Sequence, residues 1–217
     1  MKNSRFLLLV FPVIFALLAL FGWGFFYQSA VSVSCCAILL FAPDKKIRYT
    51  IWFVVAAFLF SIAGDWFLSH RNGLLIRFVI GIGLFFMGHI GYFIFCVRNG
   101  KIKYPFLFIL LIGYLLFFNN VLYPSINDNM LLMAALLYLV ISCFSLAAAT
   151  GLKLAPITCW LFSIGITLLI FSDTLIALSE FAGYHTFYYL MLPTYYGSQI
   201  VITLSLLFSS GNNNTIS

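Results

Sequence analysis

The chain consists largely of apolar runs, most of them about as long as a membrane-spanning helix, and this limits the folds open to it. A hydrocarbon layer of ~30 Å needs ~20 helical residues at ~1.5 Å each, and runs near this length follow one another with short polar breaks between them. The predicted helices are 6–26, 29–42, 50–68, 78–97, 105–123, 130–149, 157–178 and 187–208. The sequence therefore predicts an all-α integral membrane protein with eight transmembrane helices.

The composition excludes most other classes of protein. Only 7% of the 217 residues are charged and 64% are hydrophobic, whereas about 25% of the residues of a soluble domain are charged. Disorder, a coiled coil, a nucleic-acid-binding domain and a secreted disulfide scaffold are therefore excluded. The five cysteines all lie in apolar runs without metal-ligand spacing, so we expect them to pack as small apolar side chains.

The distribution of Lys and Arg predicts how the helices are oriented. With eight helices and a cytoplasmic N-terminus, nine basic residues fall on the cytoplasmic side and two, Arg71 and Arg77, on the other, as the positive-inside rule requires. The nine are Lys2, Arg5, Lys45, Lys46, Arg48, Arg98, Lys101, Lys103 and Lys153. We therefore expect a single bundle over residues 1–210 with both termini cytoplasmic, followed by a polar tail at 211–217. The expected location is a bacterial inner (cytoplasmic) membrane.

Two aspartates lie inside the predicted spans. Asp65 belongs to the third predicted helix and Asp173 to the seventh, each in the last third of its helix. Both helices run outward in the predicted topology, so the two carboxyl groups lie at a similar depth. Because an ionisable residue within a span costs several kcal/mol, two of them at one depth indicate a shared functional site.

Four further polar residues lie inside predicted helices. His89 and Tyr92 are three residues apart in the fourth, and Tyr195 and Gln199 are four apart in the eighth, so each pair lies on one helix face. Such residues often serve only as interhelical hydrogen-bond partners. Gly81, Gly88 and Gly91 form a small-residue face that we expect to pack closely against another helix.

Several polar residues lie near the predicted helix ends. His70 and Arg71 follow the third helix at the outer interface, where a lipid phosphate would lie, and they are candidates for headgroup binding. Simple solvation is the alternative for both. The remaining acids, Asp44, Asp128 and Glu180, are expected to be solvated in or beside loops.

The buried polar residues belong to four short sequence motifs. Gly64-Asp65-Trp66-Phe67-Leu68 fits G-D-x-x-L, Gly88-His89-Ile90-Gly91-Tyr92 fits G-H-x-x-Y, Ser172-Asp173-Thr174-Leu175-Ile176-Ala177 is similar to S-D-x-x-L-A, and Tyr195-Tyr196-Gly197-Ser198-Gln199 is similar to Y-Y-x-A-Q. In this order and spacing, over about residues 50–208, they resemble the motifs of the YhhN-like lysoplasmalogenases, a family of eight-helix membrane proteins.

The resemblance implies hydrolysis of the vinyl ether bond of lysoplasmalogens, which releases a fatty aldehyde and glycerophosphoethanolamine or glycerophosphocholine. Such cleavage needs one protonated carboxyl group that donates its proton to the alkene carbon, which leaves an oxocarbenium ion. It also needs a second carboxylate that stabilises this cation or deprotonates water. We expect Asp65 and Asp173 to form this pair, with the roles unassigned between them. His89, Tyr92, Tyr195 and Gln199 would orient the pair or the water.

The resemblance also bears on cofactors and partners. The reaction requires no metal and no other cofactor, and the expected partner is the lysophospholipid substrate in the membrane, with no nucleic acid and no protein implied.

Two alternatives stay open from the residues themselves. One is a proton-coupled transporter that uses the same buried aspartates, and the other is a structural or sensor protein whose aspartates only hold helices together.

Overall fold

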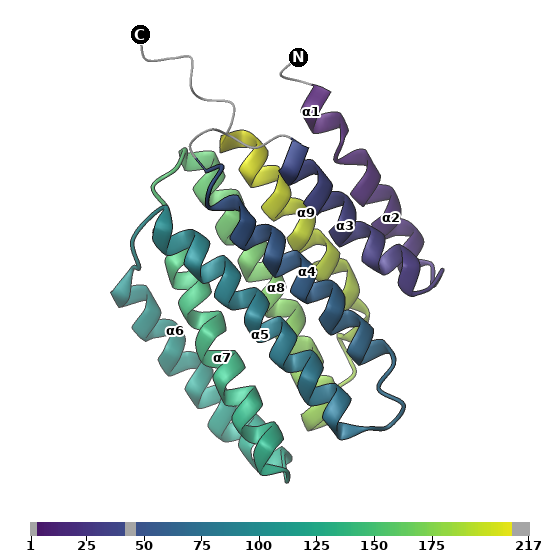
Figure 1. Cartoon of the computed structure of the whole chain (residues 1–217). Coiled ribbons are helices and arrows are strands. Elements are labelled where there is room, and N and C mark those ends of the chain that lie inside the picture. Colours follow the sequence, from purple (N-terminus) through teal and green to yellow (C-terminus); the bar gives the residue numbers. More distant parts are fainter. Residues whose placement is uncertain (1–3, 42–46, 210–217) are drawn as a thin grey trace.

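The described part of the chain is a bundle of helices (Figure 1). The computed structural model describes residues 4–41 and 47–209, where the regular structure is helical apart from one isolated bridge between Gly100 and Leu152. The elements are α1 Ser4–Leu7, α2 Val10–Leu20, α3 Phe25–Phe41, α4 Ile51–Ser69, α5 Leu75–Arg98, α6 Tyr104–Phe117, η1 Phe118–Leu122, η2 Tyr123–Ser125, α7 Asn129–Ala149, α8 Pro156–Ala182, η3 Tyr188–Leu190 and α9 Met191–Ser209. The predicted all-α class is confirmed. The tail 211–217 and the residues Lys2, Asp44, Lys45 and Lys46 lie outside the described residues.

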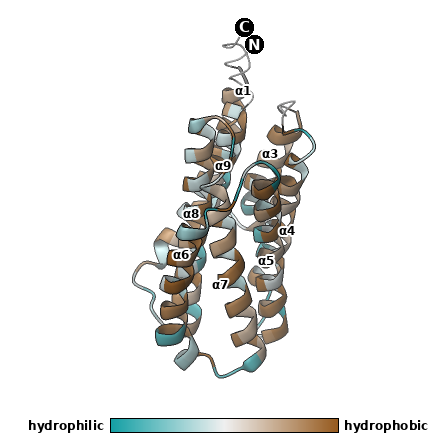
Figure 2. Ribbon diagram, turned by 90° about the vertical axis from the view of Figure 1, so that its left-hand side faces the viewer, coloured by the Kyte–Doolittle hydropathy of each residue, from teal (hydrophilic) through white to brown (hydrophobic). Residues whose placement is uncertain are grey.

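Six of the described helices are long and apolar enough to cross a membrane. They are Ile51–Ser69, Leu75–Arg98, Tyr104–Ser125, Asn129–Ala149, Pro156–Ala182 and Tyr188–Ser209. Two more, α2 and α3, are apolar but shorter, with 11 and 17 residues. The six long spans agree with the sequence analysis. That α2 and α3 also cross the membrane stays a prediction, as does the orientation of the termini. Figure 2 shows hydrophobic residues along the helices and hydrophilic residues mainly in the segments that connect them.

The first predicted helix, 6–26, is wrong at its beginning. The chain forms a short α1 and then restarts as α2 at Val10. Pro12 has no N–H to donate to the carbonyl of Leu8, four residues earlier, and that carbonyl accepts instead from the N–H of Phe11, at 3.2 Å. The proline therefore explains the break between the two helices.

The same predicted helix also ends too late. The helix stops at Leu20, because Gly22 and Gly24 follow with φ of +81° and +94°, a left-handed backbone that glycine adopts readily and most other residues do not. These two glycines turn the chain, and α3 begins at Phe25, before the predicted start at 29.

The centre of the bundle is built by close contact between neighbouring helices. Helix α5 packs against both α4 and α7, and α8 packs against α9 (Figure 1). Gly91 allows the approach of α4, since a Cβ added there would lie 2.6 Å from the carbonyl oxygen of Phe53. The predicted close packing of the glycine face is thereby confirmed. The core is dominated by large buried side chains, among them Phe58, Tyr92, Phe95, Phe162 and Ile202.

Two loops at one end of the bundle are joined by backbone hydrogen bonds. The N–H of Lys101 donates to Gly151 O at 3.0 Å, and the N–H of Lys153 donates to Asn99 O at 2.9 Å. Two of the basic loops that the sequence analysis assigned to one side therefore lie together. Arg71 lies in the connection between α4 and α5, which is at the opposite end of the bundle from these two loops.

Candidate active site

Asp65 and Asp173 line one polar cavity. Asp65 comes from the last turns of α4 and Asp173 from the second half of α8, and both side chains are partly buried. The cavity has a volume of about 280 Å³, which is room for water as well as for part of a ligand. The structure therefore brings together the two carboxyl groups that the sequence analysis paired.

Asp173 has the more elaborate surroundings of the two aspartates. Its Oδ2 accepts a hydrogen bond from the Tyr138 hydroxyl at 2.5 Å and lies 3.3 Å from Nε2 of His89. The Tyr138 distance is typical of a hydroxyl that donates to a carboxylate. Three helices, α5, α7 and α8, thus meet at one carboxyl oxygen.

His89 contacts a polar atom at each of its ring nitrogens. Nδ1 lies 2.9 Å from the hydroxyl oxygen of Ser145, which itself donates to Ser142 O at 2.9 Å. Nε2 lies 3.3 Å from Oδ2 of Asp173. A hydrogen bond at that contact needs one proton, on the ring nitrogen or on the carboxyl group.

Asp65 has a simpler set of partners. Its Oδ2 accepts a hydrogen bond from the Tyr195 hydroxyl of α9 at 2.8 Å. The ring of Tyr195 packs edge-on against Phe85, with 6.1 Å between the ring centroids. Each aspartate therefore has a tyrosine donor from another helix, but only Asp173 also contacts a histidine.

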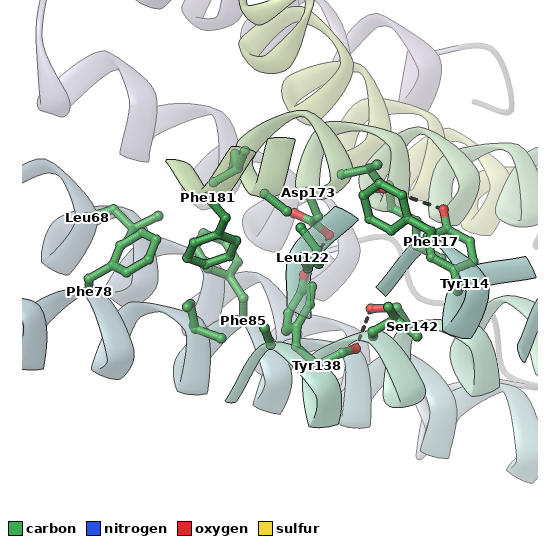
Figure 3. A pocket seen from close by; sticks show the side chains of 17 residues that line it. Leu68, Phe78, Phe85, Tyr114, Phe117, Leu122, Tyr138, Ser142, Asp173 and Phe181 are labelled. Atoms are coloured by element: carbon green, nitrogen blue, oxygen red, sulfur yellow. Dashed lines mark hydrogen bonds between the residues drawn. The ribbon is translucent and has the colours of Figure 1, made fainter. Parts of the chain in front are cut away.

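Asp173 also lines a second, apolar cavity. It has a volume of about 90 Å³ and lies among α5, α6, α7 and α8. Figure 3 shows Asp173 and Tyr138 in the middle of its lining, with Phe78, Phe85 and Phe181 to one side and Phe117 to the other. Asp173 also lines the polar cavity, so its carboxyl group lies where the polar and apolar spaces meet.

An ion pair lies at the edge of the polar cavity. Arg71 Nη1 donates to Oε2 of Glu180 at 2.6 Å, and both residues belong to the cavity lining. The hydrogen bond to Glu180 raises the pKa of the Arg71 guanidinium, which is therefore charged at any pH of interest. The guanidinium also lies 5.5 Å from the ring centroid of Phe78, in a cation–π contact.

Four residues predicted for the site do not line either of these cavities. His89 is one of them, although it contacts Asp173. The Tyr92 hydroxyl is buried without a hydrogen-bond partner among the described residues, beside His89. Oε1 of Gln199 accepts from Ser32 of α3 at 2.7 Å. His70 contacts the carbonyl of Trp66 through Nδ1, at 2.9 Å.

Two of the acids expected to be solvated have defined roles in the structure. Glu180 lies inside α8 rather than after it and forms the ion pair with Arg71. Asp128 caps the N-terminus of α7 by accepting from the N–H of Leu131 at 2.8 Å. The predicted helix ended at 178, whereas α8 continues to Ala182. For this reason the prediction did not place Asp173 and Glu180 on one helix face.

Sequence reasoning also missed Tyr138 and Ser145. Together with Ser142 they stand at i, i+4 and i+7 of α7, a spacing that places all three on one face of a helix. This polar stripe in an otherwise apolar span was the signal that could have found them. Glu180 follows Asp173 by seven residues, which is the equivalent signal on α8.

The comparisons with known proteins give one match. A model of the YhhN family matches residues 25–206, from α3 to the last turns of α9. No curated protein and no solved structure matches the chain.

Among the described residues, no group of three or more His, Cys, Asp and Glu side chains is placed to hold a metal ion.

Proposed function

The chain belongs to the YhhN family, and from that premise we propose that it is a lysoplasmalogenase-like hydrolase of a bacterial inner membrane. The substrate would be a lysoplasmalogen, and the products a fatty aldehyde and a glycerophospho-alcohol. The observation that carries the proposal is the position of Asp173 between a polar and an apolar cavity.

A lysoplasmalogen has a matching division along its length. Its glycerophospho part is polar, its chain is a hydrocarbon, and the vinyl ether bond joins the two. With the first part of the chain in the apolar cavity and the glycerol in the polar one, the bond to be cleaved lies beside Asp173. The apolar lining supplies the hydrophobic contacts that a chain needs, and the polar cavity leaves space for water.

The first chemical step is protonation of the alkene carbon on the chain side of the double bond. Asp173 faces that side, and the contact between Asp173 and His89 holds a proton. Transfer of this proton breaks the carbon–carbon π bond and leaves an oxocarbenium ion at the ether oxygen. We assign Asp173 as the general acid, with His89 as the positioning residue that keeps the proton at this contact.

The second step is capture of the cation by water. Asp65 lines the polar cavity, where its carboxylate stabilises the cation and takes a proton from the attacking water. The hemiacetal then collapses as its C–O bond to the glycerophospho oxygen breaks. That oxygen takes the proton from Asp65 and the hemiacetal hydroxyl returns a proton to Asp173, so the reaction consumes one water molecule and restores both aspartates. Tyr195 holds the Asp65 carboxylate in place through its 2.8 Å hydrogen bond.

The test is aldehyde release by the purified protein in detergent, with a chelator present. The substrate is alkenyl-lysophosphatidylethanolamine, and the saturated alkyl ether analogue is the substrate control, because it has no alkene to protonate. The variants Asp65→Asn and Asp173→Asn are compared with Asp128→Asn. This control removes a carboxylate that lines neither cavity, and asparagine can still cap α7.

The isotope pattern adds a second criterion. In water enriched in ¹⁸O, cleavage through the oxocarbenium ion leaves the original oxygen in the glycerophospho-alcohol. Aldehyde release that needs both aspartates, without ¹⁸O in the alcohol, supports the proposal. A folded wild-type protein that releases no aldehyde from lysoplasmalogens contradicts it, and proton-coupled transport in vesicles then becomes the activity to measure.

A further inference from the structure

The polar cavity contains one pair of opposite charges besides the aspartates. Arg71 is the one Lys or Arg in the lining of the two described cavities, and Glu180 is its partner. The two side chains come from residues 109 positions apart in the sequence and stay partly open to solvent, with 44% and 27% of their side-chain surface exposed. The pair is therefore both a part of the cavity and within reach of a ligand from outside.

We propose that Arg71 and Glu180 form a headgroup site for a zwitterionic lysolipid, in which Arg71 binds the phosphate and Glu180 binds a primary ammonium group. This inference rests on the proposed function, because it concerns the same substrate. It goes further by assigning the ammonium site and by predicting a preference for ethanolamine over choline.

The charges explain why the ligand is a zwitterion. A guanidinium binds phosphate through directed N–H bonds, whereas the carboxylate of Glu180 repels a phosphate unless a cation accompanies it. In a headgroup with both charges, the phosphate takes the place of Glu180 as the partner of Arg71, and the ammonium takes the place of Arg71 as the partner of Glu180. A headgroup with phosphate alone would leave Glu180 without its cation and beside a second anion.

Hydrogen bonding explains the choice between the two zwitterions. A primary ammonium has three N–H donors, and bonds between charged donors and a carboxylate are the stronger kind. The trimethylammonium group of choline has none, so it contacts Glu180 only through its charge. The lining of the polar cavity includes the polar residue Gln28 together with the aromatic residues Phe78, Phe85, Tyr188 and Tyr195, so the expected preference rests on the ammonium N–H donors alone.

A neighbouring cation provides the matched control. Arg77 lies at the same end of the bundle, on α5, but its Nη1 donates to the carbonyl of His70 at 2.5 Å and it does not line either of these cavities. Arg77→Gln therefore removes a positive charge from this end of the protein and leaves both side chains of the proposed headgroup site in place.

The first experiment measures binding without turnover. Saturated alkyl-lysophosphatidylethanolamine, -choline and -lysophosphatidic acid are titrated into wild type, Glu180→Gln and Arg77→Gln in detergent. We expect wild type and Arg77→Gln to prefer ethanolamine over choline by about tenfold, as one set of charged hydrogen bonds allows. Glu180→Gln should reduce that preference to about twofold and improve binding of lysophosphatidic acid.

A charge exchange separates binding from a structural role. The double variant Arg71→Glu with Glu180→Arg keeps an ion pair between α8 and the α4–α5 connection but moves each charge to the other side. If the pair only stabilises the fold, this variant keeps the wild-type headgroup preference, and the proposal is wrong. Loss of the ethanolamine preference in a variant that unfolds at the wild-type temperature supports it.

Soluble headgroups distinguish a lipid site from a site for free phosphoesters. Glycerophosphoethanolamine should compete more strongly than glycerophosphocholine, but about a hundredfold less strongly than the lysolipid, because it lacks the chain that the apolar cavity binds. Equal competition by both soluble esters contradicts the ammonium assignment. If wild type shows the headgroup preference but releases no aldehyde, the headgroup site stands and the proposed reaction is wrong.

Discussion

The two aspartates share a cavity but differ in what surrounds them. Asp173 contacts both a tyrosine and a histidine and borders the apolar cavity as well as the polar one. Asp65 contacts one tyrosine and lines only the polar cavity. Two identical side chains thus have different surroundings, because Asp173 borders both cavities and contacts a histidine whereas Asp65 borders the polar cavity alone.

The difference comes from the helices that contribute the partners. Asp173 receives its partners from α5 and α7, which pack against each other, whereas Asp65 receives Tyr195 from α9. Variants that change one set of partners and leave the other intact therefore test whether the two aspartates have different roles.

The largest effect is expected when either carboxyl group is removed. Asp173→Asn and Asp65→Asn should each lower kcat by about 10³-fold, within the range for loss of a general acid or base. Aldehyde release at a fixed pH measures the loss, and thermal unfolding in detergent shows whether each variant is folded. A folded variant that keeps the wild-type kcat would show that its aspartate takes no part in the reaction.

The next largest effect concerns the proton between Asp173 and His89. His89→Gln keeps a side-chain amide near Asp173 but cannot carry the proton, so we expect kcat to fall by about 10²-fold with little change in KM. Burial of His89 makes misfolding the competing explanation. Thermal unfolding in detergent therefore accompanies the kinetics, and an equal loss of activity and stability would count against a role in proton transfer.

The two tyrosines give a direct comparison between the two sites. Tyr138→Phe and Tyr195→Phe each delete one hydroxyl that donates to a carboxylate, which should lower kcat by about tenfold. Because Asp173 keeps His89 as a second partner, the Tyr138 variant should lose less than the Tyr195 variant. The opposite order, measured on the same substrate, would mean that Tyr138 rather than His89 controls Asp173.

The smallest effect concerns the apolar cavity, which Asp173 lines and Asp65 does not. Ala177 lines that cavity and not the polar one, so Ala177→Leu should shorten the space for the chain. We expect KM to rise roughly fourfold for each methylene displaced from the cavity, with kcat little changed and short-chain substrates unaffected. Ala177→Ser is the control of similar size, and a KM that rises equally for every chain length would place the chain elsewhere.

Several parts of the fold follow from local sequence. The six long spans were predicted within a few residues, because an apolar run of membrane length has few alternatives to a helix. The errors lie at Pro12, Gly22 and Gly24, where one residue decides whether a helix continues. The length of α8 was underestimated, since the polar Ser179 and Glu180 resemble a loop in sequence.

The candidate site was predictable only in part. The motifs around Asp65, His89, Asp173 and Tyr195 identified residues that the structure brings to one place. Gln199 belongs to a motif as well, yet it contacts α3 instead. A motif thus indicates that a residue matters without stating which neighbour it meets.

Residue type and spacing along a single helix were enough to predict the membrane class, the long helices and the two carboxyl groups. The packing of different helices establishes that Tyr138 donates to Asp173, that Glu180 pairs with Arg71 and that Asp173 lines an apolar cavity as well as a polar one. Those contacts join different helices, and their geometry depends on how the helices pack and rotate against one another, which helical periodicity does not fix.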